Sequence, residues 1–184
     1  MGGQRRVGLV RNALDFSTDF ERLEAGRERE FDALRNLGLH PEEVDLRAYF
    51  GAQNSLRALI HQLDALWVVG GNTFLLRRAM KQSGLDTALL ELGNDAFVYA
   101  GYSAGACVVT PSLKGVHLAD EPETVPEGYS REVIWDGLGL VPFCIVPHCR
   151  SDHPESERCE AVAGYYLEHK VPFVALRDGE VCIR

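Results

Sequence analysis

Residues 99–106 read Tyr-Ala-Gly-Tyr-Ser-Ala-Gly-Ala and place the pattern Gly-x-Ser-x-Gly directly after an apolar run. This pattern is typical of a nucleophile elbow, a sharp strand-to-helix turn that exposes a serine hydroxyl. The glycines are needed because side chains beside the serine would clash with the turn. The backbone N–H that follows can face a developing oxyanion. The stretch predicts that Ser103 is a nucleophile; the plain alternative is a strand that ends in a small-residue turn.

Outward from this stretch, apolar runs alternate with helical patterns. We expect strands at 6–10, 43–46, 65–69, 96–100, 140–146 and 173–176, and helices at 18–37, 56–63, from 73 onward and at 154–170. The Asp-Gly pair at 178–179 predicts a tight turn into a further strand at 181–183. This order predicts an α/β fold of three layers, with a mostly parallel sheet and helices on both faces. The length predicts one catalytic domain over residues 1–184.

Composition narrows the function classes. The net charge is -8 and no basic stripe is present, which argues against a nucleic-acid partner. A hydrophobic content of 46% is ordinary for a soluble globular protein. The first apolar run is too short for a signal peptide, and no run reaches membrane-spanning length. Five scattered cysteines indicate a reducing compartment. We therefore expect a cytoplasmic protein, a monomer or homodimer, that does not bind membranes.

Candidate catalytic groups lie where strands are expected to end. Parallel sheets place ligands at the carboxyl ends of their strands, and the segments 70–72, 101–106 and 147–148 all fall there. A serine needs a base, and the base needs an orienting acid. His148 ends an apolar strand and is the preferred base, with His153 as the alternative.

The acid is expected at the end of a later strand. Asp178 has the better position, and Glu180 stays open as the alternative. A cluster of histidines and cysteines matches no known spacing of zinc ligands; its members are Cys144, His148, Cys149 and His153. We predict no metal and no cofactor.

The chain order of nucleophile, histidine and acid resembles that of class I glutamine amidotransferase-like folds. Within that group, three segments resemble the peptidase E (aspartyl dipeptidase) family. They are residues 68–76 (Val-Val-Gly-Gly-Asn-Thr-Phe-Leu-Leu), residues 101–106 (Gly-Tyr-Ser-Ala-Gly-Ala) and residues 146–148 (Val-Pro-His). The resemblance extends from the third expected strand to Asp178 and implies a flavodoxin-like sheet.

The resemblance also implies site roles. Ser103 would be the nucleophile and His148 the base, with the backbone N–H groups of Gly71 and Ala104 as the oxyanion hole. Asp178 stands where the best-known members of the family carry a glutamate, so its side chain is one methylene shorter. The implied reaction is hydrolysis of dipeptides with an N-terminal aspartate, through an acyl-enzyme.

Substrate contacts follow from the same resemblance. Asp120, in an acidic loop, and Asn72, in the Gly-Gly-Asn turn, are expected near the substrate, with Asp120 close to its amine. An arginine fork suits the substrate carboxylate, and Arg150 and Arg158 are the first candidates, ahead of Arg131. Two alternatives stay open: a cyanophycinase-like β-aspartyl peptidase, and a non-catalytic binding protein of the amidotransferase-like fold.

Overall fold

The larger of two sheets has four parallel strands in the order β2-β1-β3-β4. They are β1 (Arg6–Val10), β2 (His40–Glu43), β3 (Ala65–Val68) and β4 (Val98–Gly101). A smaller parallel sheet pairs β5 (Cys144–Val146) with β6 (Phe173–Ala175). These elements come from a computed structural model that describes residues 5–92 and 97–184.

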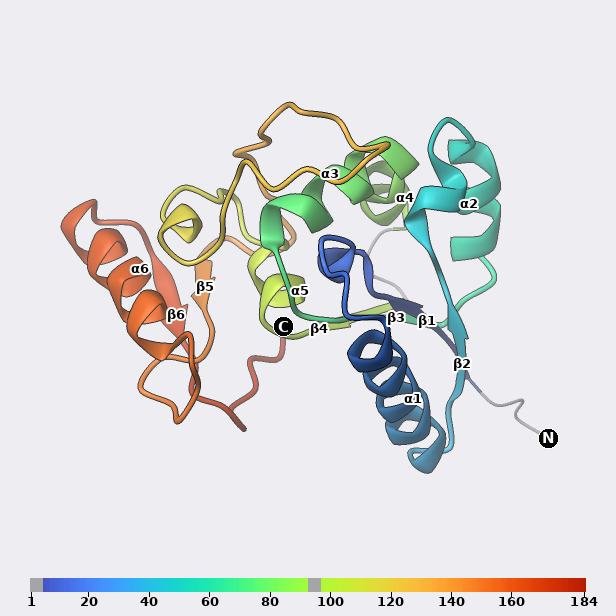
Figure 1. Cartoon of the computed structure of the whole chain (residues 1–184), viewed down its shortest axis with the longest axis horizontal. Coiled ribbons are helices and arrows are strands. Elements are labelled where there is room, and N and C mark those ends of the chain that lie inside the picture. Colours follow the sequence, from blue (N-terminus) through green and yellow to red (C-terminus); the bar gives the residue numbers. More distant parts are fainter. Residues whose placement is uncertain (1–4, 93–96) are drawn as a thin grey trace.

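Helices cover both faces of the larger sheet (Figure 1). The α-helices are α1 (Phe20–Asn36), α2 (Gln53–Ile60), α3 (Thr73–Ser83), α4 (Leu85–Glu91), α5 (Ala104–Cys107) and α6 (Ser156–Glu168). Short 3-10 turns are η1 (Asn12–Leu14), η2 (Leu46–Tyr49) and η3 (Val116–Leu118). Figure 1 shows α1 on one side of the sheet and α2, α3 and α4 on the other.

Neighbouring residues of β1 point to opposite faces, as a strand requires. Leu9 packs with Phe31 of α1, whereas Val10 belongs to the main core with Leu75 of α3. Leu9, Val10 and Leu75 are fully buried. A strand with both faces covered is typical of a parallel sheet in an α/β fold. The predicted mostly parallel α/β architecture with helices on both faces is confirmed.

Helix α3 begins directly behind the Gly-Gly-Asn turn. The side chain of Asn72 accepts a hydrogen bond from the N–H of Leu75 (2.9 Å), which caps the helix. Gly84 ends it in a left-handed conformation, φ 79°. The helix is buried along most of its length, so the turn that precedes it is held firmly against the sheet.

Three local predictions need correction. The second strand lies at 40–43 rather than 43–46, because Asp45 instead caps η2 by accepting from the N–H of Arg47 (3.0 Å). The strand expected at 140–146 begins only at Cys144, after Pro142, which lacks a backbone N–H. Residues 181–183 form no strand; the turn before them closes with the N–H of Glu180 donating to the carbonyl of Arg177 (3.0 Å).

Two further differences concern the sheet and its helices. Within residues 5–92 and 97–184, β5 and β6 pair only with each other, and β5 reaches the larger part of the molecule through α5, where the thiol of Cys107 contacts the carbonyl of Ile145 (3.7 Å). Helix α4 was not expected. The predicted start of the fourth strand at Ala96 lies outside the described residues.

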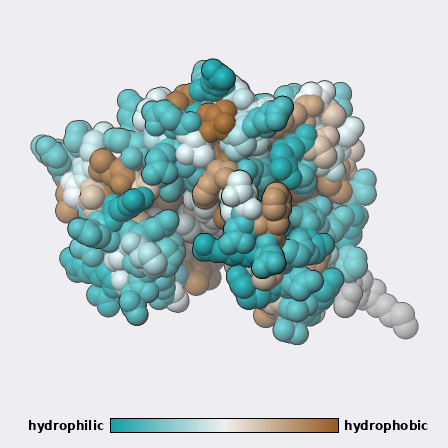
Figure 2. Space-filling view, viewed as in Figure 1, coloured by the Kyte–Doolittle hydropathy of each residue, from teal (hydrophilic) through white to brown (hydrophobic). Residues whose placement is uncertain are grey.

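The surface in this view is mostly hydrophilic and is hollowed between the part that carries α6 and the part that carries α1 (Figure 2). In the part of the chain that the structure describes, no helix combines the length and the hydrophobicity that crossing a membrane would need.

Candidate active site

Ser103 occupies a strained turn between β4 and α5. Its backbone angles are φ 51° and ψ −117°, a region that non-glycine residues rarely adopt. Such strain costs about 1–3 kcal/mol and persists only where the surroundings impose it. Gly105 shows how they do so: a Cβ there would lie 2.3 Å from the carbonyl oxygen of Val68. The close packing of α5 on β3 thus forces the turn that presents the hydroxyl.

A carboxylate from α1 supports the elbow from outside. Glu30 accepts hydrogen bonds from the hydroxyl of Tyr102 (2.8 Å) and from the indole N–H of Trp67 (2.7 Å). Burial and the hydrogen bond to Glu30 raise the pKa of Tyr102, so its hydroxyl stays protonated and donates. Glu30 therefore ties α1 to the residue before the nucleophile. Nothing in the sequence pattern signals this contact, which spans 72 positions.

Gly71 forms a second constrained turn, at the end of β3. Its φ is 139°, and a Cβ there would lie 2.4 Å from the carbonyl oxygen of Ala13. The same carbonyl accepts from the N–H of Asn72 (2.9 Å). Among the described residues, no hydrogen bond uses the N–H of Gly71 or of Ala104. Both groups are therefore available to an oxyanion, and that role stays a prediction.

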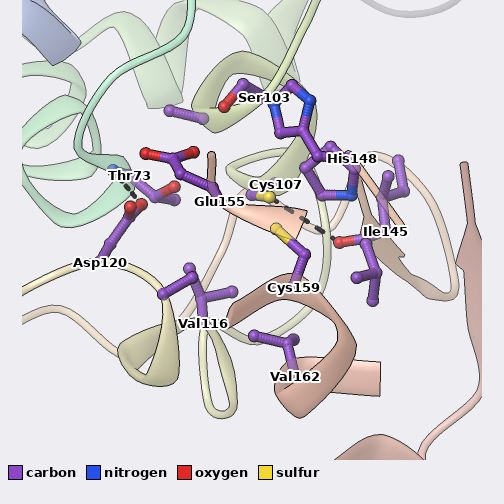
Figure 3. Close-up of a pocket in the computed structure, with 14 residues that line it drawn as sticks. Thr73, Ser103, Cys107, Val116, Asp120, Ile145, His148, Glu155, Cys159 and Val162 are labelled. Atoms are coloured by element: carbon purple, nitrogen blue, oxygen red, sulfur yellow. Dashed lines mark hydrogen bonds between the residues drawn. The ribbon is translucent and has the colours of Figure 1, made fainter. Parts of the chain in front are cut away.

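His148 and Asp178 meet at the ends of β5 and β6. Nδ1 of His148 lies 2.6 Å from Oδ1 of Asp178. The N–H of Asp178 donates to Oγ of Ser151 (2.8 Å), which fixes the loop that carries the carboxylate. Figure 3 shows the imidazole of His148 beside the hydroxyl of Ser103. The structure thus brings together the three residues that the sequence singled out.

His153 and Glu180, the alternative base and acid left open by the sequence, have other partners. His153 stacks on His148 with ring centroids 3.8 Å apart and an interplanar angle of 9°, and its Nδ1 accepts from the N–H of Glu155 (3.2 Å). Glu180 accepts from the N–H of Arg177 (2.8 Å). The geometry therefore favours His148 and Asp178 as the base and the acid.

A small pocket opens beside Ser103 and His148 (Figure 3). Its walls come from α3, α5, the loop around η3, β5 and α6. The lining residues are Thr73, Ser103, Ala104, Cys107, Val116, Ala119, Asp120, Ile145, Val146, Pro147, His148, Glu155, Cys159 and Val162. Most of this lining is apolar, with two carboxylates, so the pocket suits a small ligand that carries a positive charge.

Asp120 is the more deeply placed of the two carboxylates. Its Oδ2 accepts from the N–H of Thr73 (2.8 Å), at the start of α3. Burial raises the pKa of Asp120 to about 6, with smaller contributions from Glu155 and Glu121, while the hydrogen bonds from Thr73 oppose the shift. A carboxylate held in a pocket at such a pKa is a candidate functional group.

The other predicted substrate contacts lie away from the pocket lining. Asn72 is buried, and its amide both caps α3 and donates to the carbonyl of Glu121 (2.9 Å). Arg150 is exposed, and Nη1 of Arg158 donates to the carbonyl of Ala119 (3.4 Å), which does line the pocket. Arg131 is also exposed. The roles assigned to these residues stay predictions.

Sequence reasoning missed several pocket residues. Cys107 follows Ser103 by one helical turn, a spacing that could have revealed it. Burial raises the pKa of Cys107 well above its ordinary value and that of Cys159 to about 12, so neither thiol is an activated nucleophile. Glu155, just before α6, carries no pattern in the sequence that would have marked it.

The fold and the site together define a class. The chain is an α/β protein of amidotransferase-like character, with a serine at the elbow and a histidine–aspartate pair across the pocket. It belongs to peptidase family S51, whose pattern matches residues 22–183. The resemblance to peptidase E drawn from the sequence is thereby confirmed.

Individual relatives agree with this assignment. The chain is 33% identical over 141 residues to a peptidase E of Streptomyces coelicolor, covering 74% of this chain and 54% of that protein. It is 32% identical over 154 residues to a candidate alpha-aspartyl dipeptidase of Drosophila melanogaster, covering 80% and 58%. The chain spans just over half the length of the curated relatives that it matches.

The fold also matches a solved structure. A crystal structure of a candidate peptidase E from Listeria monocytogenes superposes with a TM-score of 0.72 at 25% identity, covering 95% of this chain and 78% of that one.

Proposed function

We propose that the protein is a serine peptidase that hydrolyses short peptides with an N-terminal aspartate, through an acyl-enzyme. One observation carries the proposal: the imidazole of His148, held by Asp178 at 2.6 Å, lies beside the hydroxyl of Ser103 on its strained elbow. Nucleophile and base come from different sheets, so we also propose that the chain works as one catalytic unit.

The acylation step follows from these contacts. Asp178 accepts from Nδ1–H of His148, which leaves the lone pair on Nε2 free to take the proton of Ser103. Oγ of Ser103 then attacks the peptide carbonyl. The N–H groups of Gly71 and Ala104 stabilise the oxyanion, and Nε2–H gives its proton to the leaving amine. The products are an aspartyl ester of Ser103 and the free C-terminal residue.

Deacylation repeats the same steps with water. His148 takes a proton from a water molecule, the hydroxide attacks the ester carbonyl, and the proton returns to Oγ of Ser103 as the bond breaks. Aspartate leaves, and the resting enzyme is restored. Asp178 stays ionised throughout and stabilises the imidazolium that forms in both halves of the reaction.

Specificity for aspartate rests on charge. Asp120, with Glu155 nearby in the lining, suits the α-ammonium of a peptide. The aspartyl carboxylate requires an arginine, and Arg158 is a candidate because it contacts the pocket residue Ala119. The names of the relatives, peptidase E and alpha-aspartyl dipeptidase, support the same substrate class.

The proposal is tested by the rates of cleavage of a dipeptide panel and by labelling of Ser103 with a serine-reactive probe. Asp-Leu should be cut at least about 100-fold faster than Asn-Leu, because the bound substrate would cover the arginine, and a covered arginine without its carboxylate is costly. Acetyl-Asp-Leu should resist cleavage. A fluorophosphonate should label the wild type and the control Ser55→Ala, whose serine is exposed on α2, but not Ser103→Ala.

Each failure of this test has its own meaning. Equal rates for Asp-Leu and Asn-Leu would overturn aspartyl specificity. Cleavage of β-aspartyl-arginine in preference to Asp-Leu would favour the cyanophycinase-like alternative. Labelling that is absent from the wild type as well would favour a non-catalytic binding protein.

A further inference from the structure

Two side chains that take no part in the proton transfers gather around the proposed base. His153 and Glu155 each offer a ligand atom that, with one from His148, forms a set whose members all lie within 4.8 Å of one another. His148 and His153 are half-buried, and Glu155 and His148 both line the pocket. Two of the three residues of this cluster therefore belong to the wall of the catalytic pocket.

The donor set has the chemistry of a zinc site. Two imidazoles and one carboxylate, with a fourth position left open, form one of the known arrangements of protein-bound Zn²⁺. Histidines that bind zinc commonly donate their other N–H to a carboxylate, which fixes the ring and strengthens the ligand. His148 has this support from Asp178 at 2.6 Å. Its Nε2 lone pair is therefore presented to a metal as well as to Ser103.

Binding requires the loop before α6 to move and the imidazole of His153 to turn, because the rings of His148 and His153 are stacked 3.8 Å apart and their in-plane lone pairs do not converge. Zinc–nitrogen bonds are about 2.0–2.1 Å long, so ligand atoms in a tetrahedral site lie roughly 3.3 Å apart. The cluster must therefore contract from its present separations of up to 4.8 Å. His153 also gives up the 3.2 Å hydrogen bond from the N–H of Glu155, since a neutral imidazole has one proton and one lone pair. These two residues lie in the loop before α6, outside any regular element.

We propose that His148, His153 and Glu155 form a Zn²⁺ site and that zinc reversibly blocks the active site. The metal takes the lone pair that His148 needs to deprotonate Ser103, so catalysis stops while zinc is bound. The inhibitory part rests on the proposed peptidase function; the metal site itself does not. Hard cations such as Mg²⁺ prefer oxygen ligands and should leave the protein unaffected.

Binding is tested first, without reference to activity. Chelator-treated Ser103→Ala protein, which keeps all three ligands, is titrated with ZnCl₂ by calorimetry. We expect one zinc per chain at this site and at least tenfold weaker binding when His153→Ala is added. The control His61→Ala changes a histidine exposed at the end of α2 and should bind as tightly as its parent. Absence of binding, or equal binding in the His153→Ala protein, would overturn the site.

Inhibition is tested next, with two readouts. Zinc should lower Asp-Leu hydrolysis by the wild type and should slow fluorophosphonate labelling of Ser103. Measured against its own zinc-free rate, the His153→Ala variant should need at least tenfold more zinc for half-inhibition, whereas MgCl₂ should have no effect on either protein. Zinc binding without any slowing of labelling would overturn the blocking role. Zinc binding to a protein that cuts no peptide in metal-free buffer would support the metal site and overturn the proposed function instead.

Discussion

The two parts of the active site are held in different ways. The half built on the four-stranded sheet places Ser103 and Gly71 through backbone packing, with positive φ angles and no room for a Cβ at Gly71 or Gly105. The half built on β5 and β6 has strands of three residues. His148 also has a positive φ, 55°, and its imidazole is held by the hydrogen bond to Asp178, whose side chain is 47% exposed. The nucleophile is thus fixed by the core, and the base by a side-chain contact near solvent.

Catalysis should need both halves equally. His148→Ala should lose roughly three or more orders of magnitude in turnover, about as much as Ser103→Ala, because an unactivated hydroxyl barely attacks. The double variant should be little worse than either single one, since the residues act as a unit. Initial rates on Asp-Leu measure this, with His61→Ala as the control. A His148→Ala protein within tenfold of the wild type would mean that another base serves Ser103.

An added methyl group should lower the stability of the protein in the half that carries Ser103 and raise it in the half that carries His148. Gly105→Ala should cost about 3 kcal/mol of stability, because its Cβ would meet the backbone of Val68 at 2.3 Å. Gly164→Ala, in α6 where nothing lies within 4 Å, should instead stabilise by about 0.5–1 kcal/mol. Urea denaturation of both variants checks this. Equal stabilities would show that the elbow is less tightly held than the structure indicates.

Replacing the acid Asp178 should lower kcat less than replacing the base His148. Asp178→Asn should lower kcat about 100-fold, because it favours the wrong tautomer of His148 without removing the imidazole. Glu180→Gln, whose side chain accepts a hydrogen bond from the N–H of Arg177, should stay within about threefold. A larger loss in Glu180→Gln than in Asp178→Asn would reverse the assignment of the acid.

Asp120 should make the stability of the protein depend on pH. Its pKa is raised from 3.8 to about 6, so its ionised form is disfavoured in the folded state. Its contribution to stability is fully present below pH 3.8 and is lost as the pH rises through 6. Asp120→Asn, whose amide oxygen can still accept from Thr73, should therefore match the wild type near pH 4.

At pH 8 the free energy of unfolding of the same variant should exceed that of the wild type by about 3 kcal/mol. Thermal melts across this range give the difference, and Asp120→Asn should raise KM for Asp-Leu while the melting temperature increases. A variant that is less stable than the wild type at pH 8 would show that Asp120 serves the fold rather than the substrate.

Local patterns in the sequence predicted the fold class and the main candidate residues of the site. The alternation of apolar runs and helical patterns predicted the α/β class, because strands buried on both faces and amphipathic helices have distinct periods. The Gly-x-Ser-x-Gly pattern located the elbow, since only small residues permit it, and the positions of His148 and Asp178 at strand ends predicted that they would meet.

Such patterns could not predict the contacts between segments that are distant in the sequence. The sequence could not choose between Asp178 and Glu180, because both follow the same strand and only the folded loop turns one toward His148. Glu30 joins the elbow from another layer of the fold, and burial of Asp120 depends on how its loop packs on α3. The local pattern decided which residue types could do chemistry, whereas tertiary packing decided their partners and surroundings, because hydrogen bonding and desolvation depend on neighbours that are remote along the chain.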